Sequence, residues 1–405
     1  MFDINEIRSK FPFFKYNSNI VYLDSSATSL KPQVVLDKMN EYYTKYSVNV
    51  HRGVYKLGYI ATEEYEKVRS KVAKFINCEE NEVIFTSSTT DGLNKLAIMY
   101  SDFLDSGDEV LTTELEHHSS LLPWMNVCKR KNVKLSYIPL NEEGRITVEN
   151  FKKVMNPKVK VVVITYVSNV LGYITPLKEI IRIAHNYNAI VVVDAAQAVS
   201  HMRVDVKDLD CDFLAFSGHK MFGPTGVGVL FGKAKLLKKL NPAFFGGDMN
   251  DLVTKESVEV KDIAYRFEAG TPMIGEVIGL GKAIDFILEL GYENIEKHLK
   301  ELHRYLLEKI KDVEGIEIYN KNADVAILSF NIKGIHPHDA VTCYDDLNIC
   351  LRAGHHCAQL VTRWLDCIGT LRASLQIYND YHDIDRFVEA TKETVRIFTK
   401  LEGGF

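Results

Sequence analysis

The sequence shows no apolar run long enough to span a membrane and no recognisable signal peptide. Its longest apolar runs, 161–167 and 189–193, stop at Ser168 and Asp194, well short of the roughly 20 residues that span a membrane. The first residues show no charged-then-apolar layout and no small-residue cleavage site, so no signal peptide is predicted. Internal repeats, low-complexity tracts and long Pro- or Ser-rich linkers are also absent. These absences argue against a membrane, secreted or repeat protein.

Cysteine is scarce and shows no pairing pattern, and neither sign of charge dominates. The seven cysteines are odd in number and irregularly spaced, and no C-x-x-C occurs, so a disulfide framework is not expected. The expected location is a reducing compartment, the cytoplasm, and the sequence leaves a processed organellar form open. The 49 Lys and Arg against 54 Asp and Glu give a net charge of −5, which disfavours nucleic acid and membrane lipid as partners.

The composition that is present is that of a globular protein. The 405 residues are 46% hydrophobic and 25% charged, and a chain of this length folds into about two to three domains. Apolar runs alternate with longer helical patterns up to about residue 290, after which an α+β pattern with alternating residues follows. We expect a segment 1–20 that packs on the small domain, a large domain 21–290, and a small C-terminal domain 291–405.

The first domain has the pattern of a mostly parallel sheet. Its strand patterns are near-continuous in Val, Ile, Leu and Phe, as in strands covered on both faces. Helical stretches separate them, including 93–104, 124–131 and 176–187, which implies right-handed β-α-β units and an α/β fold class. The expected strands are 82–86, 109–113, 133–139, 158–166, 190–194 and 211–217.

Polar side chains follow the ends of five of these strands. In an open α/β sheet, ligands bind in the crevice beyond the carboxyl ends of the strands. The pattern therefore predicts one site built from five loops. The residues concerned are Thr89, Thr90, His117, His118, Asn169, Asp194, Gln197, His219 and Lys220.

A lysine and an aspartate in this set indicate a cofactor. Lys220 ends Ser217-Gly-His-Lys before a glycine-rich turn, which suits an amine that carries a cofactor as a Schiff base; a surface lysine is the alternative. Asp194 follows the apolar run 190–193, and a buried carboxylate needs a cation such as a protonated pyridine nitrogen. Its alternative role is the N-cap of a helix that begins at Ala195.

Hydroxyl side chains gather where a predicted helix begins, in Phe85-Thr-Ser-Ser-Thr-Thr90. Free N–H groups at a helix N-terminus bind phosphate, and Thr89 and Thr90 add donors; capping without a ligand is the alternative. No G-K-[ST] follows, and Phe231 takes the third glycine position after Gly226-Val-Gly228. Nucleotide binding by these motifs is therefore unsupported.

Three further polar positions suit a flat ring. The tandem His117-His118 can stack an imidazole on such a ring, although a lone histidine there is more often a core residue. Asn169 and Gln197 can each hydrogen-bond a ring oxygen.

The string Leu351-Arg-Ala-Gly-His-His-Cys-Ala marks the second domain. A cysteine in a glycine-containing loop near Arg and His can be stabilised as a thiolate, which makes Cys357 a candidate nucleophile. The rival interpretation is a zinc site formed by His355, His356 and Cys357 together with His336 or His338. Three consecutive ligands fit a tetrahedral site poorly, so no metal is expected. Arg372 suits a substrate carboxylate, and a surface ion pair is its alternative role.

The ordered set of motifs resembles the class V branch of the fold-type-I enzymes that use pyridoxal 5′-phosphate (PLP), specifically the SUF-type (group II) cysteine desulfurases. One departure is Ser87-Ser88, where some relatives carry Arg-Gly, so a role of that arginine does not carry over to this chain. The motifs that carry the resemblance are Tyr22-Leu-Asp-Ser-Ser-Ala-Thr, His51-Arg-Gly, Ser88-Thr-Thr-Asp-Gly, Glu116-His-His, Val167-Ser-Asn-Val-Leu-Gly, Asp194-Ala-Ala-Gln-Ala, Phe216-Ser-Gly-His-Lys-Met-Phe-Gly-Pro-Thr-Gly, Arg266-Phe-Glu-Ala-Gly-Thr-Pro, Arg352-Ala-Gly-His-His-Cys-Ala and Arg372-Ala-Ser.

The resemblance implies a fold-type-I architecture, with a seven-stranded, mostly parallel sheet in the large domain and a smaller α+β domain that carries the cysteine loop. It also implies a role for each matching residue. The catalytic residues would be Cys357 as nucleophile, Lys220 as the cofactor lysine and base, and His117 stacked on the ring. The cofactor-binding residues would be Lys220, Asp194, Gln197, His117, Thr89, Thr90, Ser217, His219 and Thr271, the last supplied by a partner subunit. The substrate-binding residues would be Asn169, Arg372, Arg352 and His51.

The implied reaction converts L-cysteine to L-alanine and leaves the sulfur on Cys357 as a persulfide, for use in iron–sulfur cluster assembly. The implied partners are a second copy of the chain, forming a homodimer, and a sulfur-acceptor protein of the zinc-containing, scaffold-like type, whose zinc shell His338 would enter.

A selenocysteine lyase shares the fold and cofactor and is the nearest alternative. Another class V enzyme, an aminotransferase or epimerase, would not need Cys357. A silent sulfur-transfer scaffold is disfavoured because Lys220, Asp194 and His117 are all present.

Overall fold

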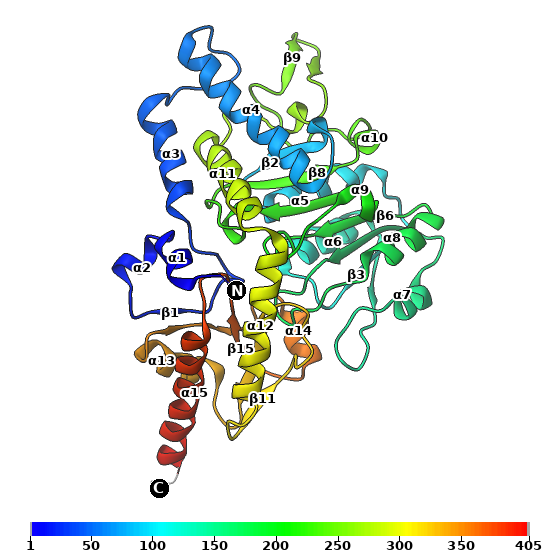
Figure 1. Cartoon of the computed structure of the whole chain (residues 1–405). Coiled ribbons are helices and arrows are strands. Elements are labelled where there is room, and N and C mark those ends of the chain that lie inside the picture. The colour runs from blue at the N-terminus through cyan, green and yellow to red at the C-terminus, as the bar shows by residue number, and fades with distance from the viewer. Residues whose placement is uncertain (1, 403–405) are drawn as a thin grey trace.

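The first part of the chain is built on a seven-stranded sheet. The computed structural model describes residues 2–402, and in it the sheet is mixed but mostly parallel, as expected (Figure 1). Only β8 runs antiparallel to its neighbours β2 and β7. In spatial order the strands are β2 (Val83–Thr86), β8 (Gly228–Gly232), β7 (Phe213–Ser217), β6 (Ile190–Asp194), β5 (Val159–Thr165), β3 (Glu109–Thr113) and β4 (Lys134–Ile138).

Alternate residues of each strand feed two separate cores, one on each face of the sheet. Val192 and Phe213 pack with α5 (Thr89–Tyr100) and α6 (His118–Lys131), whereas Val193 and Leu214 belong to the larger core on the opposite face. That core includes side chains of α4 (Lys56–Ile76), α8 (Leu177–Asn186) and α11 (Ile274–Leu290). Burial on both faces explains why the strands are continuous in apolar residues.

Two of the helices begin earlier than the sequence pattern predicts. The expected helices 93–104 and 124–131 begin at Thr89 and at His118. The polar first turns carry no apolar periodicity, so the pattern misses them. In consequence, candidate site residues stand on helix N-termini.

The C-terminal part forms a four-stranded antiparallel sheet with helices. The order of its strands is β11 (Ile316–Ile318), β12 (Ile327–Ile332), β15 (Thr370–Ser374) and β14 (Arg352–Gly354). The long helix α12 (Tyr292–Ile310) follows α11, and α13 (Pro337–Asp346) and α15 (Tyr381–Glu402) pack nearby. The observed sheet agrees with the α+β pattern expected there.

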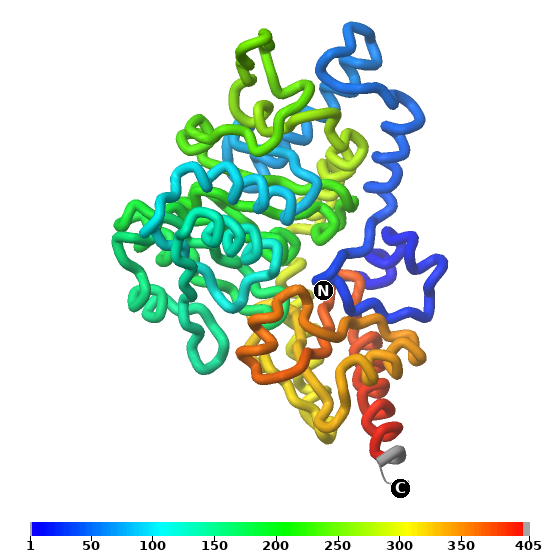
Figure 2. Tube along the Cα trace, turned by 180° about the vertical axis from the view of Figure 1, so that it is seen from behind, coloured from blue at the N-terminus to red at the C-terminus, as the bar shows by residue number. Residues whose placement is uncertain are grey.

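The N-terminal segment lies against this small sheet (Figure 2). After α1 (Ile4–Ser9) and α2 (Phe13–Tyr16), β1 (Val21–Tyr22) pairs in parallel with β13 (Ile349–Cys350). Arg8 donates to the Tyr378 carbonyl at 2.9 Å, and Asp24 forms a parallel bridge with Ser374. The start of the chain is therefore held by residues more than 300 positions away.

In the described part of the chain, no helix is long and apolar enough to cross a membrane. All seven cysteines are free thiols, and Cys357 alone among them is exposed.

Candidate active site

Twelve of the fifteen residues to which the family resemblance assigns a role line one cavity of about 380 Å³. It lies beyond the carboxyl ends of β2, β3, β5, β6 and β7, and the C-terminal sheet contributes residues of β14 and β15. The twelve are Thr89, Thr90, His117, Asn169, Asp194, Gln197, Ser217, His219, Lys220, Arg352, Cys357 and Arg372.

Lys220 lies directly after β7, at the end of the short 3₁₀ turn Gly218–Lys220. Burial is the main cause of a lowered pKa for its amine, while the carboxylate of Asp194 opposes the shift and the guanidinium of Arg372 adds to it. A lowered pKa increases the fraction of free amine, which is the nucleophilic and basic form. The alternative of a surface lysine does not fit this position.

Asp194 ends β6 and is 5% exposed. One carboxylate oxygen, Oδ1, accepts the N–H of Ala196 at 2.9 Å, and Oδ2 has no hydrogen-bond partner among the described residues. Burial raises its pKa, against the effects of the Ala196 bond and of Lys220. No helix begins at Ala195, so helix capping is not its role. A buried carboxylate with one free oxygen suits a protonated ring nitrogen such as that of PLP.

Hydroxyl groups gather in the lining of the cavity where α5 begins. Ser217 Oγ accepts the N–H of Thr89 at 2.7 Å and lies 2.6 Å from Thr89 Oγ1, and Thr90 Oγ1 lies 2.6 Å from Ser119 Oγ. Hydroxyls and the first N–H groups of a helix together form a cradle for a phosphate group. The residues present therefore fit both ends of PLP.

His117 caps the N-terminus of α6 and lines the same cavity. Its Nδ1 accepts the backbone N–H of Ser119 at 3.1 Å. Burial, followed by the positive charge of Lys220, lowers the pKa of His117 to about 3. The imidazole is therefore neutral near pH 7 and can lie against an aromatic ring.

Glu116 is a site residue whose role the sequence pattern does not reveal. Its side chain is 1% exposed and accepts hydrogen bonds from Thr113 Oγ1, Ser120 Oγ and the N–H of Thr165, at 2.7–2.9 Å. Burial raises its pKa to about 8, against the effect of these hydrogen bonds. Glu116 joins β3, β5 and α6, and thereby positions the adjacent His117.

The segment just after β1 closes the cavity from a direction that the strand pattern does not predict. Ser26, Ala27 and Thr28 line it, and Gln197 Nε2 donates to the Ser26 carbonyl at 2.7 Å. The Gln197 side chain is thus held in place through its amide nitrogen. The motif Tyr22-Leu-Asp-Ser-Ser-Ala-Thr was the available signal, but it carried no assigned role.

The C-terminal sheet supplies a buried arginine from β15. Arg372 is 2% exposed, its Nη1 donates to the Asn169 carbonyl at 2.9 Å, and its Nε is buried without a partner. Burial is the main cause that lowers its pKa to about 10. A surface ion pair is therefore not its role, and the unpartnered donor is available to a carboxylate.

Cys357 lies on the loop between β14 and α14 (Gln359–Trp364) and is exposed toward the same cavity. Its backbone has φ 54°, and His356 before it has φ 52°. Two consecutive left-handed residues are costly for L-amino acids, so the contacts around the loop must hold this conformation. Two of those contacts are a 2.7 Å bond from the His118 N–H to the Cys357 carbonyl and a 2.9 Å bond from Asn169 Nδ2 to the His356 carbonyl.

Four predicted residues do not line the cavity within one chain. His118 lies outside it, and its Nε2 accepts the N–H of Gln359 at 3.2 Å. His51 lies 2.9 Å from Glu66, which raises its pKa through a hydrogen bond. Thr271 is exposed just before α11. His338 is exposed in the first turn of α13, with its ring close to Gly354 on the cysteine loop.

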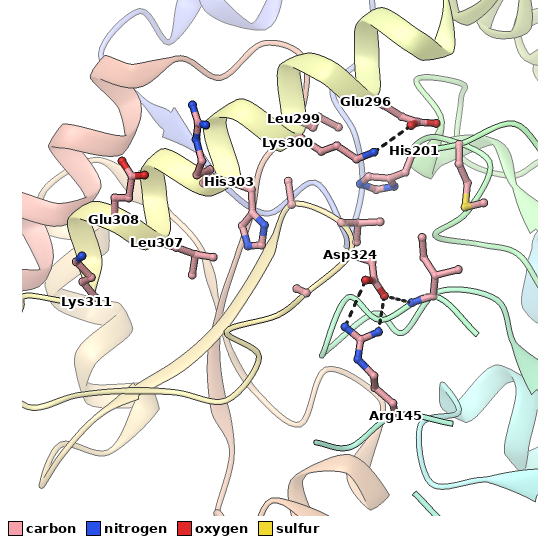
Figure 3. Close-up of a pocket in the computed structure, with 16 residues that line it drawn as sticks. Arg145, His201, Glu296, Leu299, Lys300, His303, Leu307, Glu308, Lys311 and Asp324 are labelled. Atoms are coloured by element: carbon pink, nitrogen blue, oxygen red, sulfur yellow. Dashed lines mark hydrogen bonds and ion pairs between the residues drawn. The ribbon is translucent and has the colours of Figure 1, made fainter. Parts of the chain in front are cut away.

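A larger cavity, of about 940 Å³, contains none of the predicted site residues (Figure 3). It lies along α12, and Figure 3 shows His201, His303 and the Arg145–Asp324 ion pair facing it. The larger volume therefore does not identify the candidate active site. The residues that line the smaller cavity identify it. Within the described residues, no cluster of His, Cys, Asp and Glu is placed to hold a metal ion.

The chain is similar in sequence to class-V aminotransferases and to probable cysteine desulfurases. Residues 21–387 match the family model described as aminotransferase class-V. Probable cysteine desulfurases from Halalkalibacterium halodurans and Staphylococcus aureus are each 45% identical, over 97% and 98% of this chain and 98% of theirs.

Solved structures give the same result. An apo cysteine desulfurase from Thermococcus onnurineus has a TM-score of 0.94 at 38% identity, covering 98% of this chain and 99% of that one. The Escherichia coli cysteine desulfurase CsdA, in an S-sulfonic acid form, has a TM-score of 0.92 at 34% identity with the same coverage.

Proposed function

Because this chain belongs to the class-V aminotransferase family and is a cysteine desulfurase, we propose that its cavity converts L-cysteine to L-alanine and passes the sulfur to Cys357. The observation that carries this proposal is the position of an exposed thiol on the wall of the cavity that contains Lys220. An aminotransferase or epimerase has no use for a thiol there.

PLP is the cofactor, and when bound it supplies a ring that holds the electron pair released at the substrate's Cα. Lys220 would hold it covalently, Asp194 would meet its ring nitrogen and His117 its ring face. Gln197 would meet its phenolic oxygen. The phosphate would be held by Thr89, Thr90, Ser217 and His219, with Thr271 contributed by the partner subunit.

The chain's own groups account for the remaining steps. Arg372 and Asn169 would hold the substrate carboxylate, and His51 and Arg352 would line the entrance. The Lys220 amine takes the proton from Cα, which its lowered pKa favours. The Cys357 thiolate then attacks the substrate sulfur, so that an S–S bond forms, the C–S bond breaks and its electron pair stays on carbon. Protonation of that carbon gives alanine, and the persulfide remains on Cys357.

The test is a product assay with L-cysteine and a thiol reductant, in which we expect alanine and sulfide in equal amounts. Cys357→Ala should keep the visible absorbance of the bound cofactor and lose sustained alanine release, whereas Lys220→Ala should lose the absorbance. Cys343→Ala, a thiol away from the cavity, is the matched control. Full turnover of L-cysteine by Cys357→Ala would refute the desulfurase mechanism, and turnover of selenocysteine alone would favour the lyase.

We further propose that the persulfide supplies iron–sulfur cluster assembly through a zinc-containing acceptor protein that docks near His338. The supporting observation is that the His338 ring lies close to Gly354, three residues before Cys357. His338→Ala should abolish the stimulation of turnover by such an acceptor, while His382→Ala, an exposed histidine of α15, should not. Unchanged stimulation in His338→Ala would remove this docking role.

A further inference from the structure

The larger cavity, shown in Figure 3, lies between the two parts of the chain. One wall is α12, and the other lining residues come from the loop before β12, from the segment after β6, and from Arg145 and Ile174. Its volume of about 940 Å³ falls within the range of roughly 300–1,000 Å³ that is typical of small-molecule sites. It shares no lining residue with the smaller cavity, so the proposed mechanism gives it no role.

The helix α12 turns one face toward this cavity. Its lining positions recur every three or four residues, as they do along one side of a helix. Leu299, His303 and Leu307 follow one another at intervals of four residues, and the first two are buried. Lys300 and Arg304 lie beside them and are exposed. A histidine therefore stands in the middle of an apolar line, where leucine would continue the pattern.

His303 has no hydrogen-bond partner in the part of the chain that the structure describes. Its side chain is 7% exposed, and burial lowers its pKa to about 4, so the imidazole is neutral near pH 7. A neutral imidazole has one nitrogen that donates and one that accepts. Leaving such a group buried and unpaired costs stability. Figure 3 shows the ring pointing into the cavity, so a bound molecule could supply the missing partner.

A second buried histidine borders the same cavity. His201 is also 7% exposed, and its Nδ1 donates to the carbonyl of Gln197 at 2.7 Å. Burial lowers its pKa, so Nε2 keeps its lone pair and accepts a hydrogen bond. That nitrogen has no partner among the described residues, and Figure 3 shows the ring at the cavity. A hydroxyl group, which both donates and accepts, is the complement of two neutral imidazoles.

The charged side chains at the rim favour a single negative charge on the ligand. With both histidines neutral, the lining has one more cation than anion. Arg304 and Lys311 are exposed and form no ion pair with any described residue, so they are free to meet a carboxylate. The cations are Arg145, Lys300, Arg304 and Lys311, and the anions are Glu296, Glu308 and Asp324.

We propose that this cavity is a second binding site, for an organic acid that has a ring-sized apolar body, a hydroxyl group and one carboxylate. The hydroxyl group bonds to His303, the apolar body packs against Leu299 and Leu307, and the carboxylate reaches Arg304 at the rim. Because the two cavities share no residue, the proposal does not depend on the proposed function.

The experiment measures the binding of two probes to the PLP-loaded enzyme by isothermal titration calorimetry. The probes are 3-(4-hydroxyphenyl)propionate and 3-phenylpropionate, which differ only in the hydroxyl group. The wild type should bind the hydroxylated probe roughly tenfold more tightly, because that probe satisfies a buried imidazole. His303→Leu keeps the volume and the apolar wall, and it should bring the ratio of the two affinities close to one.

A second variant tests the rim. Arg304→Gln should weaken both probes roughly fivefold and leave their ratio unchanged, because it removes a charge and not the hydroxyl partner. Lys297→Gln is the matched control, since Lys297 is an exposed cation of α12 that does not line the cavity.

Three results would overturn the proposal. The first is the absence of saturable binding of either probe to the wild type up to about 10 mM. The second is a ratio that His303→Leu leaves unchanged. The third is loss of binding in Arg372→Gln, because the probes would then occupy the smaller cavity.

Discussion

At the scale of single residues, burial decides the protonation state of several histidines. His303 is 7% exposed, its Nε2 has no partner among the described residues, and burial lowers its pKa to about 4. The unfolded chain binds a proton at a pKa near 6.5, so the folded state loses stability as the pH falls from above 6.5 toward 4. His303 lies in the cavity of Figure 3, away from the candidate active site.

His303→Leu should therefore stabilise the protein in mild acid. Leucine fills a similar volume and removes the unsatisfied imidazole. It also removes the free-energy cost of keeping His303 neutral in the folded wild type, which is about 2 kcal/mol at pH 5. The measurement is the free energy of unfolding in urea at pH 7.5 and pH 5, with the exposed His382→Leu as control. If His303→Leu lost as much stability as the wild type between these pH values, His303 would not be buried as a neutral group.

At the scale of elements, the candidate phosphate cradle depends on close packing between a helix and a strand. Gly228 begins β8, and a Cβ placed there would lie 2.6 Å from the carbonyl carbon of Ser88, the N-cap of α5. No larger residue fits without moving the helix start, which carries Thr89 and Thr90.

Gly228→Ala should weaken PLP binding and lower the free energy of unfolding by about 1–3 kcal/mol, the cost of overpacking. Gly247→Ala is the matched control, because nothing lies within 4 Å of its added Cβ. Equilibrium titration with PLP and thermal denaturation measure the two effects. A Gly228→Ala protein with wild-type PLP affinity would show that the start of α5 does not bind the cofactor.

At the scale of the whole molecule, one end exposes apolar side chains that a globular surface rarely leaves uncovered. Val54 at the approach to α4 is 87% exposed, and Val253 in β9 (Asn250–Val253) is 61% exposed. Figure 1 shows α4 and β9 reaching the same end, opposite the C-terminal helix. We propose that a second copy covers this surface and supplies Thr271 to the cavity.

Val54→Asp combined with Val253→Asp should convert a dimer to a monomer in multi-angle light scattering, because it places charge in an apolar interface. Desulfurase activity should fall with it, since Thr271 of the partner subunit would be lost. Tyr16→Asp, at a residue that is also 87% exposed but lies in α2, should leave the mass unchanged. A wild-type protein that is monomeric at micromolar concentration would contradict the proposal.

The sequence by itself determined the part of the candidate site that lies at the carboxyl ends of the strands. Lys220, Asp194, Thr89 and His117 each follow an apolar strand, and parallel strands bring their carboxyl ends to one edge, so spacing alone was enough to bring them together. The parallel-sheet pattern of the first part of the chain and the α+β pattern of its C-terminal part followed from the same periodicity. The strand β8 escaped prediction because glycine-rich residues at its start read as a turn.

Only the tertiary structure decided the part of the site that the N-terminal segment and the C-terminal sheet contribute. The register that sets Arg352 opposite Arg372, and the carboxylate of Asp24 that reaches an arginine 348 residues away, depend on how distant segments pack. The left-handed backbone at Cys357 and the bond from Asn169 to its loop depend on the same packing. Local sequence fixes which residues end a strand, but the pairing of remote segments is set by the burial of the whole chain, which no local pattern contains.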